Sequence, residues 1–128
     1  FEFMQQIALK YRNAPYLWGG KTPFGIDCSG FTQQVFKICG YRLLRDATQQ
    51  FAQGKTIAKF DEYKAGDLAF FSNEGDQVHH VGILLENKKI IHASGFVRTD
   101  TIGEEGIIDV QSGKVKYVLA GIKRICAE

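Results

Sequence analysis

Cys28 is the residue whose surroundings best suit chemistry. It follows a loop punctuated by glycines, is flanked by the polar residues Asp27 and Ser29, and precedes a helical apolar pattern that starts at Phe31. A thiol at the start of a helix meets the positive end of the helix dipole and free backbone N–H groups, and both favour the thiolate. Cys28 is therefore a candidate nucleophile. The alternative is a small buried apolar side chain, as most free cysteines are, although the polar flanks argue against it.

The other cysteines have no such surroundings. Cys39 and Cys126 each follow an isoleucine, with neither a loop nor polar flanks, so we expect both to pack in the core. Three cysteines cannot all pair with one another, which leaves at least one thiol unpaired within the chain. The sequence has no C-x-x-C pair, and its spacing does not suggest a zinc site with His79 or His92. We expect no metal and no cofactor.

A thiol nucleophile needs a base within hydrogen-bond reach, and the base needs a partner that fixes its tautomer. The three histidines are His79 and His80, which precede the apolar run 81–85, and His92, which ends the next run. If these runs form a hairpin around 86–88, all three histidines converge at one sheet edge. Taken singly, each could be an ordinary rim residue. Alternation puts His79 and His80 on opposite faces, so the pattern alone leaves both open as the base.

The elements that must position these residues fall into two halves. Apolar residues at helical spacing predict helices over 2–12 and 28–38 and a shorter one within 45–53, with a loop over 15–25. After residue 60, short runs of β-branched and aromatic residues predict strands over 68–71, 81–85, 89–92, 106–110 and 115–124. Helices followed by antiparallel strands indicate an α+β fold.

Composition sets the class of molecule. The chain has 128 residues and 45% hydrophobic residues, enough for a single core without disulfides. Its formal charge of +2 is spread along the sequence, so we expect no nucleic acid as a partner. No apolar run approaches the roughly 18 residues of a membrane span. The chain opens at Phe1 without an initiating methionine, so we expect a single domain over 1–128 that is the C-terminal part of a longer protein, preceded by targeting or substrate-cleft segments.

Five motifs, in order and at matching spacing, resemble the NlpC family of papain-like cell-wall peptidases. They are Tyr16-x-Trp18-Gly19-Gly20, Asp27-Cys28-Ser29-Gly30-Phe31, Gly66-Asp67-Leu68-x-Phe70-Phe71, His80-Val81-Gly82-Ile83 and Ile91-His92-Ala93. The resemblance implies a papain-like fold in which N-terminal helices pack on a central antiparallel sheet. It also implies that Cys28 is the nucleophile, His80 the general base and His92 the residue that orients it.

The resemblance further implies a set of substrate-binding residues. They are Tyr16, Trp18, Asp27, Ser29, Arg45, Asp46 and Thr48. Tyr16 would lie near the nucleophile and help to bind the oxyanion, and Asp27 and Ser29 would contact the amine and backbone of a peptide. The segment that starts at Arg45 would line the cleft, although Ala47 replaces a serine frequent in the family.

Each of these residues also has a structural interpretation. Tyr16 and Trp18 could be core aromatics, and Asp27 or Ser29 could cap the second helix. Similarly, Arg45 and Asp46 could form a solvated charge pair. For Asp27 and Ser29 the capping role and the substrate role are compatible.

The substrate implied by the resemblance is a stem peptide of bacterial peptidoglycan, cut between γ-D-glutamate and meso-diaminopimelate or lysine. The segment 96–100 is similar to family members that process released muropeptides. The implied location is the bacterial cell envelope, with a cytoplasmic recycling role as the alternative. Two other functions stay open: an N-acetylmuramoyl-L-alanine amidase or acyltransferase of the same fold, and a non-catalytic domain that binds the cell wall.

Overall fold

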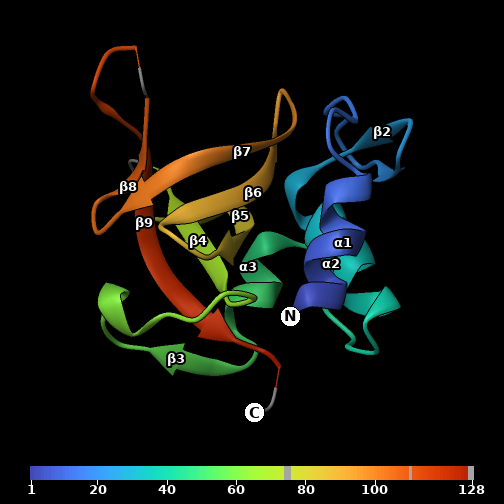
Figure 1. Cartoon of the computed structure of the whole chain (residues 1–128), viewed down its shortest axis with the longest axis horizontal. Helices are drawn as coiled ribbons and strands as arrows, with labels where there is room; N and C mark the ends of the chain where they lie inside the picture. Colours follow the sequence, from blue (N-terminus) through green and yellow to red (C-terminus); the bar gives the residue numbers. More distant parts are fainter. Residues whose placement is uncertain (74–75, 110, 127–128) are drawn as a thin grey trace.

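The N-terminal part of the chain is helical, as the apolar spacing predicted. The computed structural model describes residues 1–73, 76–109 and 111–126 and has helices α1 Glu2–Lys10, α2 Cys28–Ile38 and α3 Ala47–Phe51 (Figure 1). Helix α2 begins at Cys28 because the side chain of Asp27 accepts a hydrogen bond from the Gly30 N–H at 2.7 Å. The helix ends just before Gly40, whose φ of 92° suits a residue beyond a helix C-terminus.

The remainder of the chain is mainly strand. The strands are β1 Lys21–Thr22, β2 Gly25–Ile26, β3 Lys55–Ile57, β4 Leu68–Ser72, β5 Val78–Leu85, β6 Lys89–Ser94, β7 Phe96–Gly103, β8 Gly106–Ile108 and β9 Val115–Arg124, with a 3-10 turn at Phe60–Glu62. The five strands predicted from the sequence correspond to β4, β5, β6, β8 and β9. The predicted strand 106–110 ends at Ile108, and Val110 lies outside the described residues. Strand β7 was not predicted.

The main sheet closes on itself. Its strand order is β3-β9-β4-β5-β6-β7-β8, and β8 also pairs with β9, so β4 to β9 form a closed six-stranded antiparallel ring with β3 added on the outside of β9. The expected α+β arrangement is therefore present, but the expected central sheet is a barrel-like ring and not an open layer. Figure 1 shows the helices gathered on one side of this barrel.

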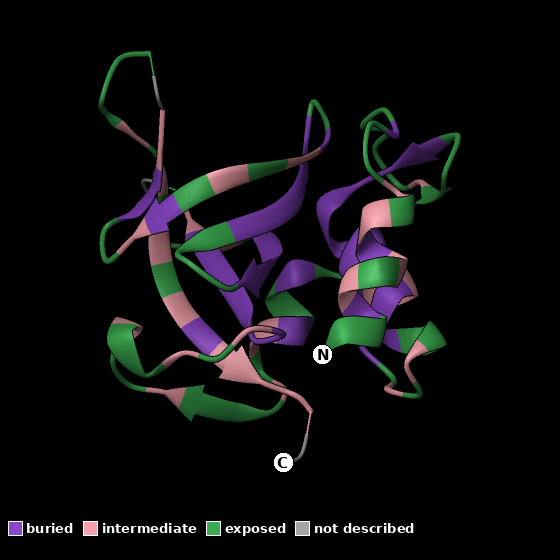
Figure 2. Ribbon diagram, in the orientation of Figure 1, coloured by how far each residue is buried: buried purple, intermediate pink, exposed green. Residues whose placement is uncertain are grey.

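Two cores meet at the barrel wall, which is why β4 is buried on both faces (Figure 2). Leu68 and Phe70 belong to the core under the helices, whereas Ala69 and Phe71 belong to the core inside the barrel. Helix α2 packs against β5 and β6. This packing brings the start of α2 to the end of the barrel where the histidines lie.

In the described part of the chain, no helix combines the length and the apolar character that a membrane crossing requires.

Candidate active site

Cys28 lies at the first turn of α2, against the backbone of β5. Its side chain is buried, with 6% of the residue exposed, and Sγ donates a long hydrogen bond of 3.8 Å to the carbonyl oxygen of His79. The register of β4 and β5 shifts at His79, which is skipped between the pairs of His80 and Val78, and this leaves its carbonyl available. The backbone N–H of Val81 also faces the sulfur. The thiol therefore lies against the backbone directly before and after His80.

Burial decides the protonation of the thiol. It raises the pKa of Cys28 to about 11, although the backbone N–H groups of Val81 and Ser29 favour the thiolate. The N–H groups at the helix start do favour the thiolate, as predicted, but burial has the larger effect on the pKa of Cys28. Desolvation outweighs the helix N-terminus, so the resting group is a neutral thiol.

His80, His92 and Asp100 form a hydrogen-bonded chain across three strands. His80 Nε2 lies 2.7 Å from His92 Nδ1, and His92 Nε2 lies 2.7 Å from Asp100 Oδ2. Because a carboxylate only accepts, His92 Nε2 carries the proton, and His92 Nδ1 then accepts from His80 Nε2–H. This assignment leaves His80 Nδ1 unprotonated and free to act as a base.

The charges of this chain follow from burial and from its hydrogen bonds. Burial and the neighbouring His92 hold the pKa of His80 well below its ordinary value, so His80 is neutral at pH 7. Burial also lowers the pKa of His92, against the opposing effect of Asp100. Burial raises the pKa of Asp100, but hydrogen bonds from His92 and the charge of Arg98 outweigh it and hold that pKa below its usual range. Asp100 is therefore a carboxylate next to two neutral imidazoles.

Arg98 accompanies Asp100 on β7. Its Nη2 donates to Asp100 Oδ1 at 3.3 Å, and its Nε lies 3.0 Å from Oδ2 as an ion pair without hydrogen-bond geometry. No role was predicted for Asp100 from the sequence. A signal was available, because alternation along 96–103 places Arg98 and Asp100 on one face, and β7 pairs Arg98 with His92. The role was missed because 96–103 was not predicted as a strand.

The choice between the two adjacent histidines follows from this geometry. His80 is buried and contacts His92, whereas the His79 residue is exposed and offers its backbone carbonyl to the thiol. His92 is fully buried. The structure therefore brings together Cys28, His80 and His92, the three residues predicted to be catalytic.

All seven residues predicted to bind substrate line one cavity of about 660 Å³, together with Cys28. They are Tyr16, Trp18, Asp27, Ser29, Arg45, Asp46 and Thr48. Trp18 is 85% exposed, so the alternative of a core aromatic is wrong for this residue. Cys28 thus lies against the backbone on both sides of His80 and also lines this open cavity.

An ion pair between Asp27 and Arg45 forms one wall of the cavity. Arg45 Nη1 and Nη2 donate to the two carboxylate oxygens of Asp27 at 3.1 and 2.9 Å, and Nη1 also donates to Ser29 Oγ at 3.0 Å. Asp27 accepts further hydrogen bonds from the backbone of Gly19 and Gly30. Burial raises the pKa of Asp27, but these bonds outweigh it and hold the pKa below its usual range. Arg45 therefore pairs with Asp27, and not with Asp46 as in the alternative structural interpretation.

Asp46 and Thr48 have local structural roles as well as facing the cavity. Asp46 is the N-cap residue of α3, and its N–H donates to the side chain of Gln49 at 3.1 Å. Thr48 Oγ1 donates to the carbonyl oxygen of Val78 at 3.1 Å, which ties α3 to the start of β5.

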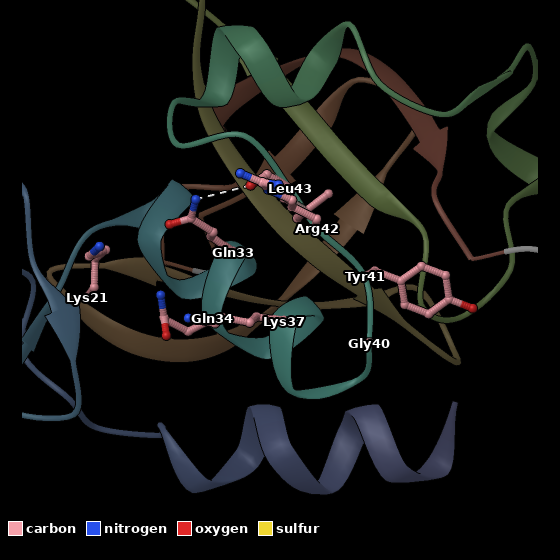
Figure 3. Close-up of a pocket in the computed structure, with 8 residues that line it drawn as sticks. All are labelled: Lys21, Gln33, Gln34, Lys37, Gly40, Tyr41, Arg42 and Leu43. Atoms are coloured by element: carbon pink, nitrogen blue, oxygen red, sulfur yellow. Dashed lines mark hydrogen bonds between the residues drawn. The ribbon is translucent and has the colours of Figure 1, made fainter.

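A second hollow, of about 520 Å³, lies between α2 and the segment 40–43 (Figure 3). Its lining includes the cations Lys21, Lys37 and Arg42 but contains no cysteine, histidine or carboxylate. The chemistry described above therefore belongs to the cavity beside Cys28. Cys39 and Cys126 are half-buried free thiols that pack against the core under the helices, as predicted.

A thiol at a helix start beside a buried histidine pair, on an antiparallel sheet, is the arrangement of a cysteine peptidase. Residues 13–116 match the model of the NlpC/P60 family. The chain belongs to this family, as the five sequence motifs predicted.

Two curated relatives and one solved structure illustrate the similarity. The chain is 47% identical over 90 residues to the gamma-D-glutamyl-L-lysine dipeptidyl-peptidase of Bacillus subtilis (strain 168), covering 69% of this chain and 30% of the relative. It is 40% identical over 97 residues to the bifunctional muramidase/DL-endopeptidase CwlT of the same strain, covering 73% and 29%. An NLP/P60 family structure from Staphylococcus aureus subsp. aureus Mu50 superimposes with a TM-score of 0.79 at 34% identity, covering 99% of this chain and 41% of that chain. The chain thus spans less than a third of the length of these two curated relatives.

Proposed function

We propose that this chain is a cysteine peptidase domain that hydrolyses the amide bond between γ-D-glutamate and an L-diamino acid in peptidoglycan stem peptides. The observation that carries the proposal is the placement of the Cys28 thiol against the backbone directly before and after His80, in the lining of a cavity, with His80 linked through His92 to Asp100. The 47% identical relative acts, by its name, on γ-D-glutamyl-L-lysine, which supports L-lysine as the diamino acid.

Acylation starts from two neutral groups. His80 Nδ1 takes the proton of the Cys28 thiol as the sulfur attacks the amide carbonyl, so the S–C bond forms while the imidazolium forms. The N–H groups at the start of α2 and the hydroxyl of Tyr16 stabilise the oxyanion. Burial and the proximity of Cys28 and Asp27 raise the pKa of Tyr16, which keeps its hydroxyl protonated as a donor. The C–N bond then breaks, and the departing amine takes the proton from His80.

Water completes the cycle. His80 removes a proton from water as its oxygen attacks the thioester, the C–S bond breaks, and the sulfur recovers the proton from His80. His92 and Asp100 are positioning residues in both steps. They hold His80 in one tautomer and stabilise the positive charge that it acquires.

The cavity suits a short peptide that carries charges of both signs. Asp27 and Arg45 present a carboxylate and a guanidinium to it, and the Arg45 side chain is 30% exposed. A γ-linked glutamyl peptide carries an ammonium at its N-terminus and a free α-carboxylate beside the scissile bond. We propose that these two groups bind to the wall formed by Asp27, Ser29 and Arg45.

Product analysis tests this function. L-Ala-γ-D-Glu-L-Lys and its meso-diaminopimelate counterpart are incubated with the protein, with C28A and with C39A, and the products are identified by mass spectrometry. We expect L-Ala-D-Glu and the free diamino acid from the unchanged protein and from C39A, and no cleavage by C28A. Intact peptides across a panel of muropeptides, or full activity of C28A, would refute the proposal. Release of the whole stem peptide from its muramoyl group would instead identify the amidase.

We further propose that residues 1–128 act as one catalytic domain of a longer protein of the bacterial cell envelope. The much greater length of the curated relatives supports the longer protein, and the names of the cell-wall enzymes among them support the location. Sequencing of the full open reading frame tests whether the protein is longer. Fractionation of cells that express it tests the location in the cell envelope. A frame that ends at these residues, or a protein recovered only from the cytoplasm, would count against them.

A further inference from the structure

Tyr117 covers one face of the imidazole of His80. The two ring centroids lie 4.2 Å apart and the ring planes meet at 12°, so the rings are stacked. The Tyr117 hydroxyl lies 2.7 Å from Ser94 Oγ. Tyr117 belongs to β9 and Ser94 to β6, so this contact joins two strands that are not neighbours in the sheet. Tyr117 also lies one residue beyond the span that matches the family.

His80 needs such a support. The side-chain torsion that turns a histidine ring is broad, so a single hydrogen bond defines the ring plane poorly. His80 must keep Nε2 on His92 and Nδ1 available to the thiol at the same time. The other rings near His80 in the described part of the chain are tilted to it, with centroids 5.7 Å (Phe71), 5.0 Å (His92) and 6.4 Å (His79) away and ring planes at 45°, 74° and 45°. Only the Tyr117 ring is stacked on His80 among these described rings.

The face of a tyrosine ring also attracts positive charge. During the reaction proposed above, His80 changes from a neutral imidazole to an imidazolium, and its stacking partner gains attraction at that moment. An interaction that strengthens only as the charge forms lowers the barrier and not merely the energy of the resting site.

We propose that Tyr117 is a positioning residue for His80 that fixes its ring plane through the stacked ring and stabilises its imidazolium. The inference rests on the proposed function for its catalytic consequence, whereas the effect on the protonation of His80 can be measured without any substrate.

Several charged or titratable groups surround the stack. His92 faces His80 from β6, with Asp100 and Arg98 behind it on β7, and His79 precedes it on β5. Lys116 opposes positive charge on His80, and its Nζ lies 5.7 Å from the centre of the Tyr117 ring. Cys28 faces the same stretch of β5 from α2. Replacement of Tyr117 removes none of these charged or titratable groups, although Lys116, His79 and His92 each lose a contact with its ring.

The test compares Y117L, which removes the aromatic face, with Y117F, which keeps it and loses the hydroxyl. NMR titration of the histidine rings, with His80 assigned through H80Q, gives the protonation of His80. We expect the midpoint of His80 in Y117L to move to lower pH, because the imidazolium loses its partner. We also expect kcat on L-Ala-γ-D-Glu-L-Lys to fall about tenfold or more with KM within about twofold. Y117F and S94A should keep kcat within about threefold.

The direction in which the titration midpoint of His80 shifts in Y117L distinguishes stabilisation of the imidazolium from simple exclusion of water. If Tyr117 only excluded water, Y117L would admit water and move the midpoint to higher pH, and that result would overturn the proposal. Equal losses in Y117L and Y117F would overturn it as well. Y117M replaces Y117L if the latter does not fold. If the unchanged protein cleaves no peptide, the proposed function fails, and the titration still decides the role of Tyr117.

Discussion

The reactivity of Cys28 depends on how far its thiol is buried more than on its place at a helix start. Burial raises its pKa to about 11, so few molecules hold a thiolate at neutral pH. We expect alkylation of Cys28 by iodoacetamide, in the absence of substrate, to keep accelerating with pH up to at least pH 10. Peptide mass spectrometry at a series of pH values measures the rate, with Cys39 as the internal comparison. A rate that levels off below pH 8 would show a thiolate in the resting protein and contradict the assignment of a neutral Cys28 thiol beside a neutral His80.

Asp100 is the residue whose charge holds the histidine chain in one orientation. D100N exchanges its carboxylate for an amide. The amide can turn its NH2 group, instead of its oxygen, toward His92 Nε2, and it carries no negative charge to stabilise an imidazolium. A charge-assisted hydrogen bond contributes about 1.5–3 kcal/mol, so we expect kcat to fall by about ten- to a hundredfold. The exposed Asp61 provides the control, since D61N should leave kcat unchanged. Equal activity of D100N and the unchanged protein would remove Asp100 from the mechanism.

The same carboxylate makes stability depend on pH. Its pKa in the folded protein lies below the ordinary value, so its contribution is complete above the pKa of the unfolded chain and is lost as pH falls through the lower, folded value. The stability difference between D100N and the unchanged protein should therefore be largest near neutral pH and shrink toward pH 3. Urea unfolding across this range measures it, and a difference that grows on acidification would contradict the assignment.

At the scale of elements, Gln50 joins α3 to the start of α2. Its Nε2 donates to the carbonyls of Ser29 and Leu44 at 3.1 and 2.8 Å, and its Oε1 accepts from Thr32 Oγ1 at 2.8 Å. Gln50 is fully buried, and Q50L would remove the side-chain donor to the Leu44 carbonyl, whereas Thr32 Oγ1 and the Ser29 carbonyl keep their mutual hydrogen bond of 3.0 Å. An unsatisfied buried group costs about 1–3 kcal/mol, so we expect stability to fall by about that amount. Urea unfolding tests this, with Q6L on the exposed face of α1 as the control.

If Q50L loses no more stability than Q6L in urea unfolding, the hydrogen bonds of Gln50 do not hold α3 against α2. A second readout is the activity, because the carbonyls that Gln50 binds belong to Ser29 and to the residue before Arg45. We therefore expect KM to rise more than kcat falls.

The elements that could be predicted are those set by residues close together in the sequence, and the others depend on contacts between distant segments. Helix α2 could be predicted to the residue because Asp27 caps it and Gly40 follows it. The hairpin of β5 and β6 could be predicted because its turn separates two apolar runs. Strand β7 could not be predicted, since its alternating residues look like a polar loop until Val97 pairs with β6 and Ile102 pairs with β8, where both are buried. The burial that raises the pKa of Cys28 likewise depends on contacts between segments far apart in the sequence.

For the molecule as a whole, closure of the barrel links the site to the strands on its far side. Strand β7 carries Asp100 and β9 carries Tyr117, and the two strands are connected through β8. No local signal in the sequence indicates that β8 pairs with β9, which is why closure of the central antiparallel sheet was not predicted. The active-site geometry is therefore a property of the closed ring.

Gly106 makes this closure possible, so its replacement is the most direct test of the ring. Its φ of 141° is a conformation that favours glycine, and a Cβ there would overlap the carbonyl oxygen of Tyr117. G106A must separate β8 from β9, and we expect a loss of about 3 kcal/mol or more in urea unfolding. G103A is the matched control because a Cβ at this position meets open space and its φ is not positive. Because separation would displace Tyr117 from His80, G106A should also lower kcat below that of G103A at a temperature where both are folded. Equal stability and activity of the two variants would show that the site does not depend on closure.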